Sequence, residues 1–275
     1  MCGFFFNISS SEIYNKDSNL LRFDKLKHRG IDNSSFIEII NKKKIFLGHH
    51  RLSINDLDRR ANQPMKSDCG NYHILFNGEI YNFNYLKKEL NYNFKTTTDT
   101  EVILAGYKKI GKAFLKKIEG FFSILILDMR ENKIVITVDP TSCKSVYYEK
   151  NKDFISIASE LNSFMPTKSN NLINSISKES LKIYMQYGYI HAPYSILNNV
   201  FKVEPGELIE FNLTDFEVSH YKDFNKHFYK KDHRSIEDLL IESHKSRLMA
   251  DVPIAKMLSS GVDSTCSNVI YSKIL

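Results

Sequence analysis

The 275-residue sequence contains little cysteine, and its cysteines show no pattern of shared use. Cys2, Cys69, Cys143 and Cys266 have no CxxC spacing and no accompanying His/Cys cluster of the kind that binds zinc. We therefore predict no metal site, and free thiols in a reducing compartment. Each cysteine then needs an explanation of its own.

Long apolar runs and a strong excess of one charge are also missing. No stretch approaches the length of a membrane span, and the N-terminus lacks the features of a signal peptide, so we expect a cytoplasmic protein without a membrane partner. The net charge is only +6, and basic residues are interspersed with acidic ones. Short basic runs such as 42–44 are typical of solvated surface, so no nucleic-acid partner is expected.

The remaining composition, 42% hydrophobic and 25% charged, predicts a folded chain of one large domain or two smaller ones. Short, β-rich apolar runs lie at 3–8, 36–40, 45–48, 74–76, 121–128 and 134–139. Helical patterns lie at 20–27, 85–90 and 99–110, the last with a Thr98 cap and Gly111 beyond its end. Strands separated by groups of helices predict an α+β sandwich over roughly the first 190 residues.

The pattern changes near the C-terminus. Residues 235–249 predict an amphipathic helix, residues 252–258 an apolar strand, and residues 259–264 a tight Ser/Gly loop. Strand, loop and helix start are typical of the opening of an α/β nucleotide-binding domain. The chain ends too soon after the loop to complete such a sheet. We therefore expect an aggregation-prone C-terminus, whose removal after about Leu208 improves solubility.

Cys2 is the most informative single residue. A small second residue allows removal of Met1, which leaves a cysteine that carries both a thiol and a free α-amine. An α-amine titrates near ~8 and can accept the thiol proton without a histidine, so nucleophile and base share one residue. The alternative is an ordinary exposed or buried thiol, and the dipeptide alone does not decide against it.

The tripeptide Asn77-Gly78-Glu79 directly follows the apolar run 74–76. Attack on an amide forms an oxyanion that needs preorganised donors. An Asn side-chain amide and a Gly backbone N–H at a strand end could supply two of them. The alternative is a plain β-turn, because Asn-Gly is the strongest hairpin signal, and taken alone the turn is the better interpretation.

Three charged residues match the needs of a site for free glutamine, which carries a carboxylate and an ammonium. Such a site requires a bidentate arginine and a carboxylate, and Arg51, Glu79 and Asp99 offer these charges. The alternatives are a surface ion pair for Arg51 and a helix N-terminal acid for Asp99. His49 and His50 are interpreted as structural, since the α-amine makes a histidine base unnecessary.

Together these segments resemble the glutaminase domain of glutamine-hydrolysing asparagine synthetase. The matching blocks occur in the family's order at 2–3, 28–32, 48–57, 63–65, 76–82, 99–101 and 158–160. The resemblance implies a class II glutamine amidotransferase domain at residues 2–190 with an N-terminal-nucleophile hydrolase fold, an αββα sandwich. It implies Cys2 as nucleophile and Asn77 and Gly78 as oxyanion hole, without a cofactor. The residues implied to bind glutamine are Arg51, Leu52, Ser53, Ile54, Asn77, Gly78, Glu79 and Asp99.

Later segments fit the same family. Residues 191–234 are expected to form a connector, and residues 235–275 the incomplete beginning of an ATP-binding domain. The loop at 259–264 resembles the pyrophosphate-binding loop of ATP-pyrophosphatase domains, in which hydroxyls and N–H groups hold phosphates. The implied nucleotide contacts are Leu258, Ser259, Gly261, Asp263 and Ser264, and the complete synthetase reaction would require ATP and Mg²⁺.

The sequence departs from the family pattern at several positions. Ile31 replaces a proline, Val138 an arginine, and residues 142–145 a Gly-Ile-Lys-Pro run. Ser260 replaces the first of two glycines, and its side chain could obstruct the approach of backbone to phosphate, so a vestigial ATP site is an alternative.

The leading hypothesis is glutamine hydrolysis that supplies ammonia for ATP-dependent asparagine synthesis from aspartate. Because the synthetase part is largely missing, a separate synthetase chain or a homodimer would be a partner. Two alternatives remain: a related amidotransferase with another carboxylate acceptor, and a non-catalytic truncated remnant. The presence of Cys2, Asn77, Gly78, Arg51 and Asp99 argues against the remnant.

Overall fold

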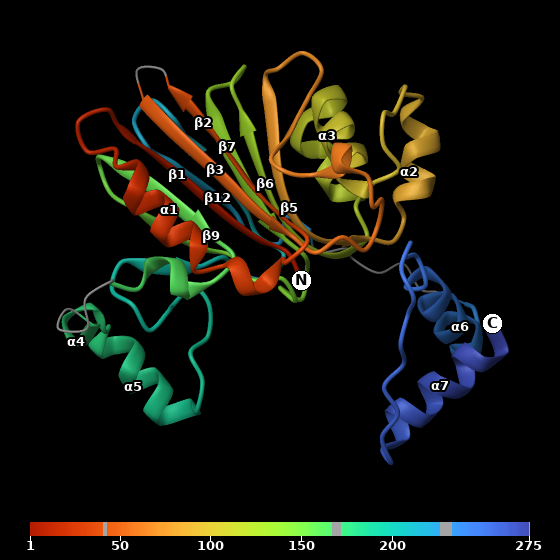
Figure 1. Cartoon of the computed structure of the whole chain (residues 1–275). Helices are drawn as coiled ribbons and strands as arrows, with labels where there is room; N and C mark the ends of the chain where they lie inside the picture. The colour runs from red at the N-terminus through yellow and green to blue at the C-terminus, as the bar shows by residue number, and fades with distance from the viewer. Residues whose placement is uncertain (41–42, 167–171, 226–232, 275) are drawn as a thin grey trace.

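The computed structural model describes residues 1–40, 43–166, 172–225 and 233–274. Two six-stranded antiparallel sheets pack face to face, with helices on both outer faces (Figure 1). The αββα sandwich predicted from the sequence is therefore confirmed. None of the helices in these described ranges is long and apolar enough to cross a membrane.

The first sheet places the N-terminal strand near its centre. Its order is β10 (Val200–Lys202), β8 (Tyr147–Lys150), β9 (Phe154–Ala158), β1 (Gly3–Ser10), β3 (Lys43–Arg51) and β2 (Asn33–Ile40). Strand β1 pairs with β3 along its whole length, from Gly3 opposite His50 onward, and with β9 on its other side. Pairing on both sides fixes the start of the chain in the middle of the molecule.

The second sheet carries the predicted tripeptide on one of its inner strands. Its order is β12 (Val218–Tyr221), β11 (Leu208–Asn212), β7 (Lys133–Val138), β6 (Gly120–Asp128), β5 (Tyr72–Ile80) and β4 (Met65–Lys66). Strand β5 pairs with β6 from Tyr72 to Ile80. Residues 77–79 thus continue a strand, and the interpretation of Asn-Gly as a plain turn is wrong.

The helices cover the two outer sheet faces. The outer layers and connections contain α1 (Lys16–Asp24), α2 (Phe83–Leu90), α3 (Asp99–Ile110), α4 (Leu172–Ser175) and α5 (Lys178–Tyr187), together with 3-10 turns at Lys27–Arg29, Arg59–Ala61, Gly111–Lys117 and Leu161–Phe164. Helix α3 packs on β5, whereas α1 packs on β1 and β3. Helix α3 begins after its Thr98 cap and ends at Gly111, as the sequence predicts.

The three consecutive phenylalanines of β1 show how the layers are held together. Phe4 and Phe6 point into the cluster between the sheets, while Phe5 points the other way and packs with Phe23 of α1. All are fully buried, because successive side chains of a strand face opposite sides of the sheet and both sides are covered here.

The segment expected to be a connector, residues 191–234, instead contributes β10, β11 and β12 to the two sheets. Leu208, Ile209 and Phe211 of β11 are fully buried. These strands have only three to five residues, too few for a clear alternating pattern. Part of the segment, residues 226–232, lies outside the described residues.

The C-terminal part consists of two helices that pack against each other, α6 (Ile236–Ser246) and α7 (Val262–Ile274). They lie beside the sandwich rather than within it (Figure 1). Residues 252–258 form no strand, contrary to expectation, because they are hydrogen-bonded to neither sheet and an unpaired strand leaves its backbone groups unsatisfied. Met257 is 92% and Leu258 68% exposed.

The truncation expected from the sequence, after about Leu208, would remove most of the buried strand β11. A truncation that keeps the sandwich intact must therefore lie further along the chain. We predict that a chain ending at Asn225 melts cooperatively, because this residue ties the end of the segment to strand β7. Asn225 Nδ2 donates to Thr137 Oγ1 at 2.6 Å and to the Val138 carbonyl at 3.1 Å. A chain ending at Glu207 should not fold. Each large side chain removed from the core costs about 2–5 kcal/mol, and whole domains are stable by only about 5–15 kcal/mol.

Thermal melting followed by circular dichroism distinguishes the two truncated chains. A cooperative transition in the chain that ends at Glu207 would show that β11 is dispensable. Loss of the transition in the chain that ends at Asn225 would show that the C-terminal helices belong to the same folding unit.

Candidate functional site

The backbone of Cys2 is anchored directly ahead of β1. Arg29 Nε donates to the Cys2 carbonyl at 2.7 Å, and Arg29 Nη1 lies 2.5 Å from Glu160 Oε1. The Arg29 side chain is only 10% exposed, so this ion pair is largely shielded from solvent. Arg29 and Glu160 belong to the segments that carried the resemblance, but no role for either side chain could be predicted from the sequence.

The thiol of Cys2 lies next to the backbone of Leu52, the residue that directly follows β3. Its Sγ accepts from the Leu52 N–H at 3.4 Å and lies 3.7 Å from the Leu52 carbonyl oxygen. Burial raises the pKa of the thiol, and the Leu52 backbone hydrogen bond opposes this rise. The buried thiol therefore requires a base to remove its proton.

The terminal ammonium lies next to this thiol. Burial lowers the pKa of the Met1 ammonium, and the charges of Arg29 and Lys144 lower it further. Both effects favour the free amine, which is the form that can accept a proton.

A cavity of about 100 Å³ opens beside Cys2 and brings together the predicted catalytic and glutamine-binding residues except Ser53. It is lined by Met1, Cys2, Arg51, Leu52, Ile54, Asn55, Gln63, Phe76, Asn77, Gly78, Glu79, Thr98, Asp99, Thr100 and Lys144. The backbone N–H of Ser53 instead donates to Asp32 Oδ2 at 2.7 Å, which ties this part of the chain to the 28–32 segment.

The side-chain amide of Asn77 is a buried donor without a partner. Asn77 is 2% exposed, and its Nδ2 makes no hydrogen bond within the described part of the chain. A buried donor left unpaired costs roughly 1–3 kcal/mol, so a bound group that accepts a hydrogen bond from it would be stabilising. Because Asn77 lines the cavity, this donor is available to a bound group.

The next residue, Gly78, lets the cavity wall come close to its neighbouring strand. A Cβ atom at Gly78 would lie 2.3 Å from the Phe121 carbonyl oxygen and 2.7 Å from the Phe122 Cα. Any side chain at this position would therefore displace β5 from β6 and move the Asn77 donor.

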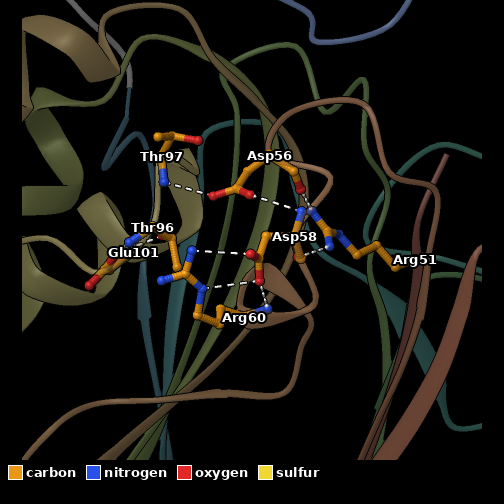
Figure 2. A network of polar contacts seen from close by, with 7 residues as sticks. All are labelled: Arg51, Asp56, Asp58, Arg60, Thr96, Thr97 and Glu101. Atoms are coloured by element: carbon orange, nitrogen blue, oxygen red, sulfur yellow. Dashed lines mark hydrogen bonds and ion pairs between the residues drawn. The ribbon is translucent and has the colours of Figure 1, made fainter.

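Arg51, at the end of β3, is a buried cation held by neutral oxygens (Figure 2). Its Nη1 donates to the Asp58 carbonyl at 3.1 Å and to Asn62 Oδ1 at 2.8 Å. Its Nη2 donates to the carbonyls of Asn55, at 3.0 Å, and Asp56. Arg51 is 5% exposed and forms no ion pair with any described residue, so the surface-ion-pair interpretation is wrong. A buried positive charge held in this way is suited to an anionic ligand.

Asp56 connects this arginine to the other side of the cavity (Figure 2). Its carboxylate accepts from the N–H groups of Thr97 at 2.7 Å and Asp58 at 3.0 Å. Its φ of 56° lies in the left-handed region, which Asp and Asn enter more readily than most residues. Sequence reasoning assigned no role to Asp56, because its contacts are made with backbone groups.

Asp99 is a buried acid at the first residue of α3. It is 4% exposed, and its carboxylate accepts from the Ile80 N–H at 3.1 Å and from the Thr98 hydroxyl at 3.2 Å. Burial raises the pKa of Asp99 to about 6, and the charge of Glu79 contributes to this rise. Asp99 therefore lies at the N-terminus of a helix, as one interpretation predicted, and also lines the cavity.

The two histidines of β3 do not line the cavity. His49 Nε2 lies 3.0 Å from the Phe76 carbonyl oxygen, and burial lowers the pKa of His49 to about 3. The His50 ring stacks on Phe23 with ring centroids 3.9 Å apart. Both positions agree with a structural role.

Gln63 and Lys144 also line the cavity, although neither was predicted from the sequence to be a site residue. The Gln63 side-chain amide pairs with the Phe76 backbone, accepting at 2.6 Å and donating at 3.2 Å, and so holds β5 in place. Lys144 belongs to the divergent 142–145 run, and its Nζ lies 3.4 Å from Met1 Sδ. Gln63 belongs to a segment that matched the family, which was the available signal.

The C-terminal loop gathers hydroxyl and amide groups ahead of α7. Ser259 Oγ and Ser264 Oγ lie 2.8 Å apart, and the Gly261 N–H donates to Ser259 Oγ at 3.2 Å. Ser259 and Gly261 are exposed, and Ser264 is half-buried. Donors of this type at a helix start suit phosphate oxygens. Among the described residues, no group of three or more His, Cys, Asp or Glu side chains is placed to hold a metal ion.

Comparison with known proteins matches two successive parts of the chain to two families. Residues 1–222 match the glutamine amidotransferase domain family, and residues 235–270 match the asparagine synthase family. The chain is 34% identical over 263 residues to putative asparagine synthetase [glutamine-hydrolyzing] 2 of Methanocaldococcus jannaschii, covering 87% of this chain and 51% of that protein. It is 32% identical over 248 residues to asparagine synthetase [glutamine-hydrolyzing] 1 of Bacillus subtilis, covering 86% and 38%.

Structural comparison gives the same fold. The glutamine phosphoribosylpyrophosphate amidotransferase from Bacillus subtilis, solved with ADP and GMP, aligns with a TM-score of 0.54 at 17% identity, over 78% of this chain and 48% of that one. The chain spans about half or less of the length of the relatives it matches. Since the amidotransferase match covers most of the sequence, the chain belongs to the glutamine amidotransferase domain family.

Proposed function

We propose that this chain hydrolyses glutamine with Cys2 as its N-terminal nucleophile and supplies the ammonia to an asparagine-synthetase-type reaction. The observation that carries the proposal is the buried, unpartnered Asn77 amide in the cavity that also contains the Cys2 thiol. An unpaired donor beside a nucleophile is the arrangement that amide hydrolysis requires.

The chemistry follows from these two groups. Once Met1 is removed, the α-amine of Cys2 takes the thiol proton, and Sγ attacks the side-chain amide carbon of glutamine. The resulting oxyanion accepts from Asn77 Nδ2 and the Gly78 N–H. The tetrahedral species collapses, ammonia leaves with the proton from the amine, and a thioester with Cys2 remains. Water then attacks the thioester, which releases glutamate and restores the thiol.

Substrate recognition uses the charged walls of the cavity. The Nη atoms of Arg51 already donate four hydrogen bonds to protein oxygens, so its guanidinium would attract the α-carboxylate of glutamine through its uncompensated charge. Asp99 with Glu79 would bind the ammonium of glutamine. Leu52 and Ile54 would line the substrate, while Ser53 would act through its backbone, which Asp32 fixes. Burial of Arg51 and Asp99 strengthens both contacts, because solvent screening is weak in such a site.

The C-terminal segment is proposed to be the beginning of the ATP-binding part. The match of residues 235–270 to the asparagine synthase family supports this assignment, as do the names of the relatives. Bound ATP, with Mg²⁺, would activate the carboxylate that receives ammonia, aspartate in the leading hypothesis. The residues proposed to contact it are Leu258, Ser259, Gly261, Asp263 and Ser264.

We further propose a domain division that follows the observed strands, with the amidotransferase unit ending near residue 225 and the ATP-binding part starting near residue 235. The rest of the ATP-binding part would come from a longer chain or a separate synthetase chain. An amidotransferase with a different carboxylate acceptor is the second candidate, because the cavity described here determines the ammonia donor alone.

Loss of the nucleophile tests the central proposal. We expect the purified chain to release glutamate and ammonia from glutamine, and Cys2→Ala to release neither. The matched control is Cys266→Ala, which removes an exposed thiol from α7 and should leave turnover unchanged. Mass spectrometry of the same preparation should show that Met1 is absent. Turnover by Cys2→Ala, or by a chain that retains Met1, would contradict the proposal.

Removal of the unpartnered donor tests the oxyanion hole. We predict that Asn77→Ala lowers kcat for glutamine hydrolysis by about 10²–10³-fold, the usual effect of deleting one oxyanion donor. KM should change little, because the donor binds the transition state more tightly than the substrate. Asn174→Ala, at an exposed position in α4, is the control. A rise in KM with unchanged kcat would assign Asn77 to substrate binding instead.

The raised pKa of Asp99 predicts a pH-dependent preference for substrates that carry an ammonium. Asp99 is neutral below its pKa of about 6 and then cannot pair with the ammonium of glutamine. The ratio of kcat/KM for glutamine to kcat/KM for glutaramate, which lacks the ammonium, should therefore fall as pH drops through that value. Taking the ratio cancels the titration of the α-amine. In Asp99→Asn the ratio should be low and independent of pH, and a pH-dependent ratio in this variant would exclude Asp99 as the titrating group.

A further inference from the structure

The segment between α6 and α7 contacts residues beside the glutamine cavity at two places. At its start, the Arg247 guanidinium carbon lies 4.7 Å from the ring centroid of Tyr81 and 5.6 Å from that of Phe121. Tyr81 directly follows β5, and the Phe121 carbonyl is the atom that excludes a side chain at Gly78. This end of the segment therefore rests on the wall that carries the proposed oxyanion donors.

At the other end, Asp251 holds the loop that follows Arg51. Asp251 Oδ2 accepts from the Asp56 N–H at 2.6 Å, and the Asp251 N–H donates to the Ile54 carbonyl at 2.9 Å. Ile54 lines the cavity. Two opposed hydrogen bonds to residues 54 and 56 fix both the position and the orientation of this loop relative to residue 251.

Asp56 carries this constraint to the arginine. Its N–H donates to Asp251. Its carbonyl accepts from Arg51 Nη2, and its carboxylate accepts from the N–H groups of Thr97 and Asp58 (Figure 2). Because Asp56 has a φ of 56°, a relaxation toward the commoner negative φ would rotate the peptide groups on both sides. The carbonyl that holds the Arg51 guanidinium would then move, so the hydrogen bond that the Asp56 N–H donates to Asp251 helps to keep Arg51 in position.

We infer that Asp251 is a positioning residue for the carboxylate subsite of the glutamine cavity, acting through Asp56 on Arg51. The inference rests on the proposed function and adds a dependence that this function does not contain. Asp251 lies in the 235–270 segment that matches the asparagine synthase family, whereas Arg51 and Asp56 lie in the 1–222 amidotransferase match. Glutamine affinity thus depends on a side chain supplied from outside the amidotransferase domain.

The same contact links the two parts of the chain thermodynamically. Residue 251 leads through residues 252–258 to the Ser259–Ser264 loop without an intervening helix or strand. If glutamine binding favours the hydrogen-bonded state of Asp251, that state favours glutamine to the same extent, because coupling between two sites is reciprocal.

The test compares glutamine binding by calorimetry in chains that carry Cys2→Ala, so that no turnover is needed. Asp251→Ala should raise Kd for glutamine about tenfold. Asp251→Asn keeps an acceptor oxygen for the Asp56 N–H and should stay within about threefold of the parent. Glu242→Ala removes an exposed charge of the same sign from α6 and should have no effect. An unchanged Kd in Asp251→Ala would overturn the inference.

Kinetics with Cys2 intact separate positioning from general damage. Asp251→Ala should raise KM for glutamine with kcat within about twofold, because the oxyanion donors do not depend on Asp56. For 4-aminobutanamide, which lacks the α-carboxylate, kcat/KM should not change. Equal losses for both amides, or equal losses in Asp251→Ala and Asp251→Asn, would overturn the inference. Absence of turnover in the unmodified chain would overturn the proposed function alone if calorimetry still showed the shift in Kd, and absence of glutamine binding would overturn both.

Discussion

The structure depends on holding the second residue of a chain in a fixed position. A chain terminus is normally the most mobile part of a protein, because few contacts hold it. Here the first residues form a central strand whose side chains are buried on both faces, with Phe4 and Phe6 between the sheets and Phe5 under α1. The half-buried Arg29–Glu160 pair then fixes the Cys2 carbonyl, to which Arg29 donates. The remainder of the sandwich provides the layers that make this burial possible.

Two groups in the cavity are costly for the empty protein. Asn77 leaves a buried donor without a partner, and Arg51 places a buried cation among neutral oxygens. Both arrangements reduce the stability of the fold, since a buried polar group or charge is stable only when it is paired. A ligand with a carboxylate and a polarisable carbonyl would satisfy both groups. Ligand binding would therefore recover free energy that the empty protein loses through these two groups.

Those parts of the fold that have a strong local pattern could be predicted from the sequence. Helix α3 has regular apolar spacing and a residue suited to each end, and β1, β6 and β7 are continuous apolar runs. The short strands β10 to β12 were missed, because they exist through pairing with distant strands rather than through local preference. Conversely, residues 252–258 have the composition of a strand but lack a partner. The charged residues that line the cavity could be predicted by their type, whereas the oxygens around Arg51 could not, since a backbone carbonyl has no signature in a sequence.

The place of Met1 has a practical consequence for making the protein. Met1 lines the same cavity as Cys2, and its sulfur lies 3.4 Å from Lys144 Nζ and 4.0 Å from Arg29 Nη2. A retained Met1 therefore occupies part of the space where the substrate would lie, and an affinity tag or a leader peptide at this end would also leave Cys2 without its free amine. Recombinant protein is best made with its tag at the C-terminus and in a host whose methionine aminopeptidase is not saturated. A molecule that keeps Met1 would have a partly occupied cavity and no free amine on Cys2.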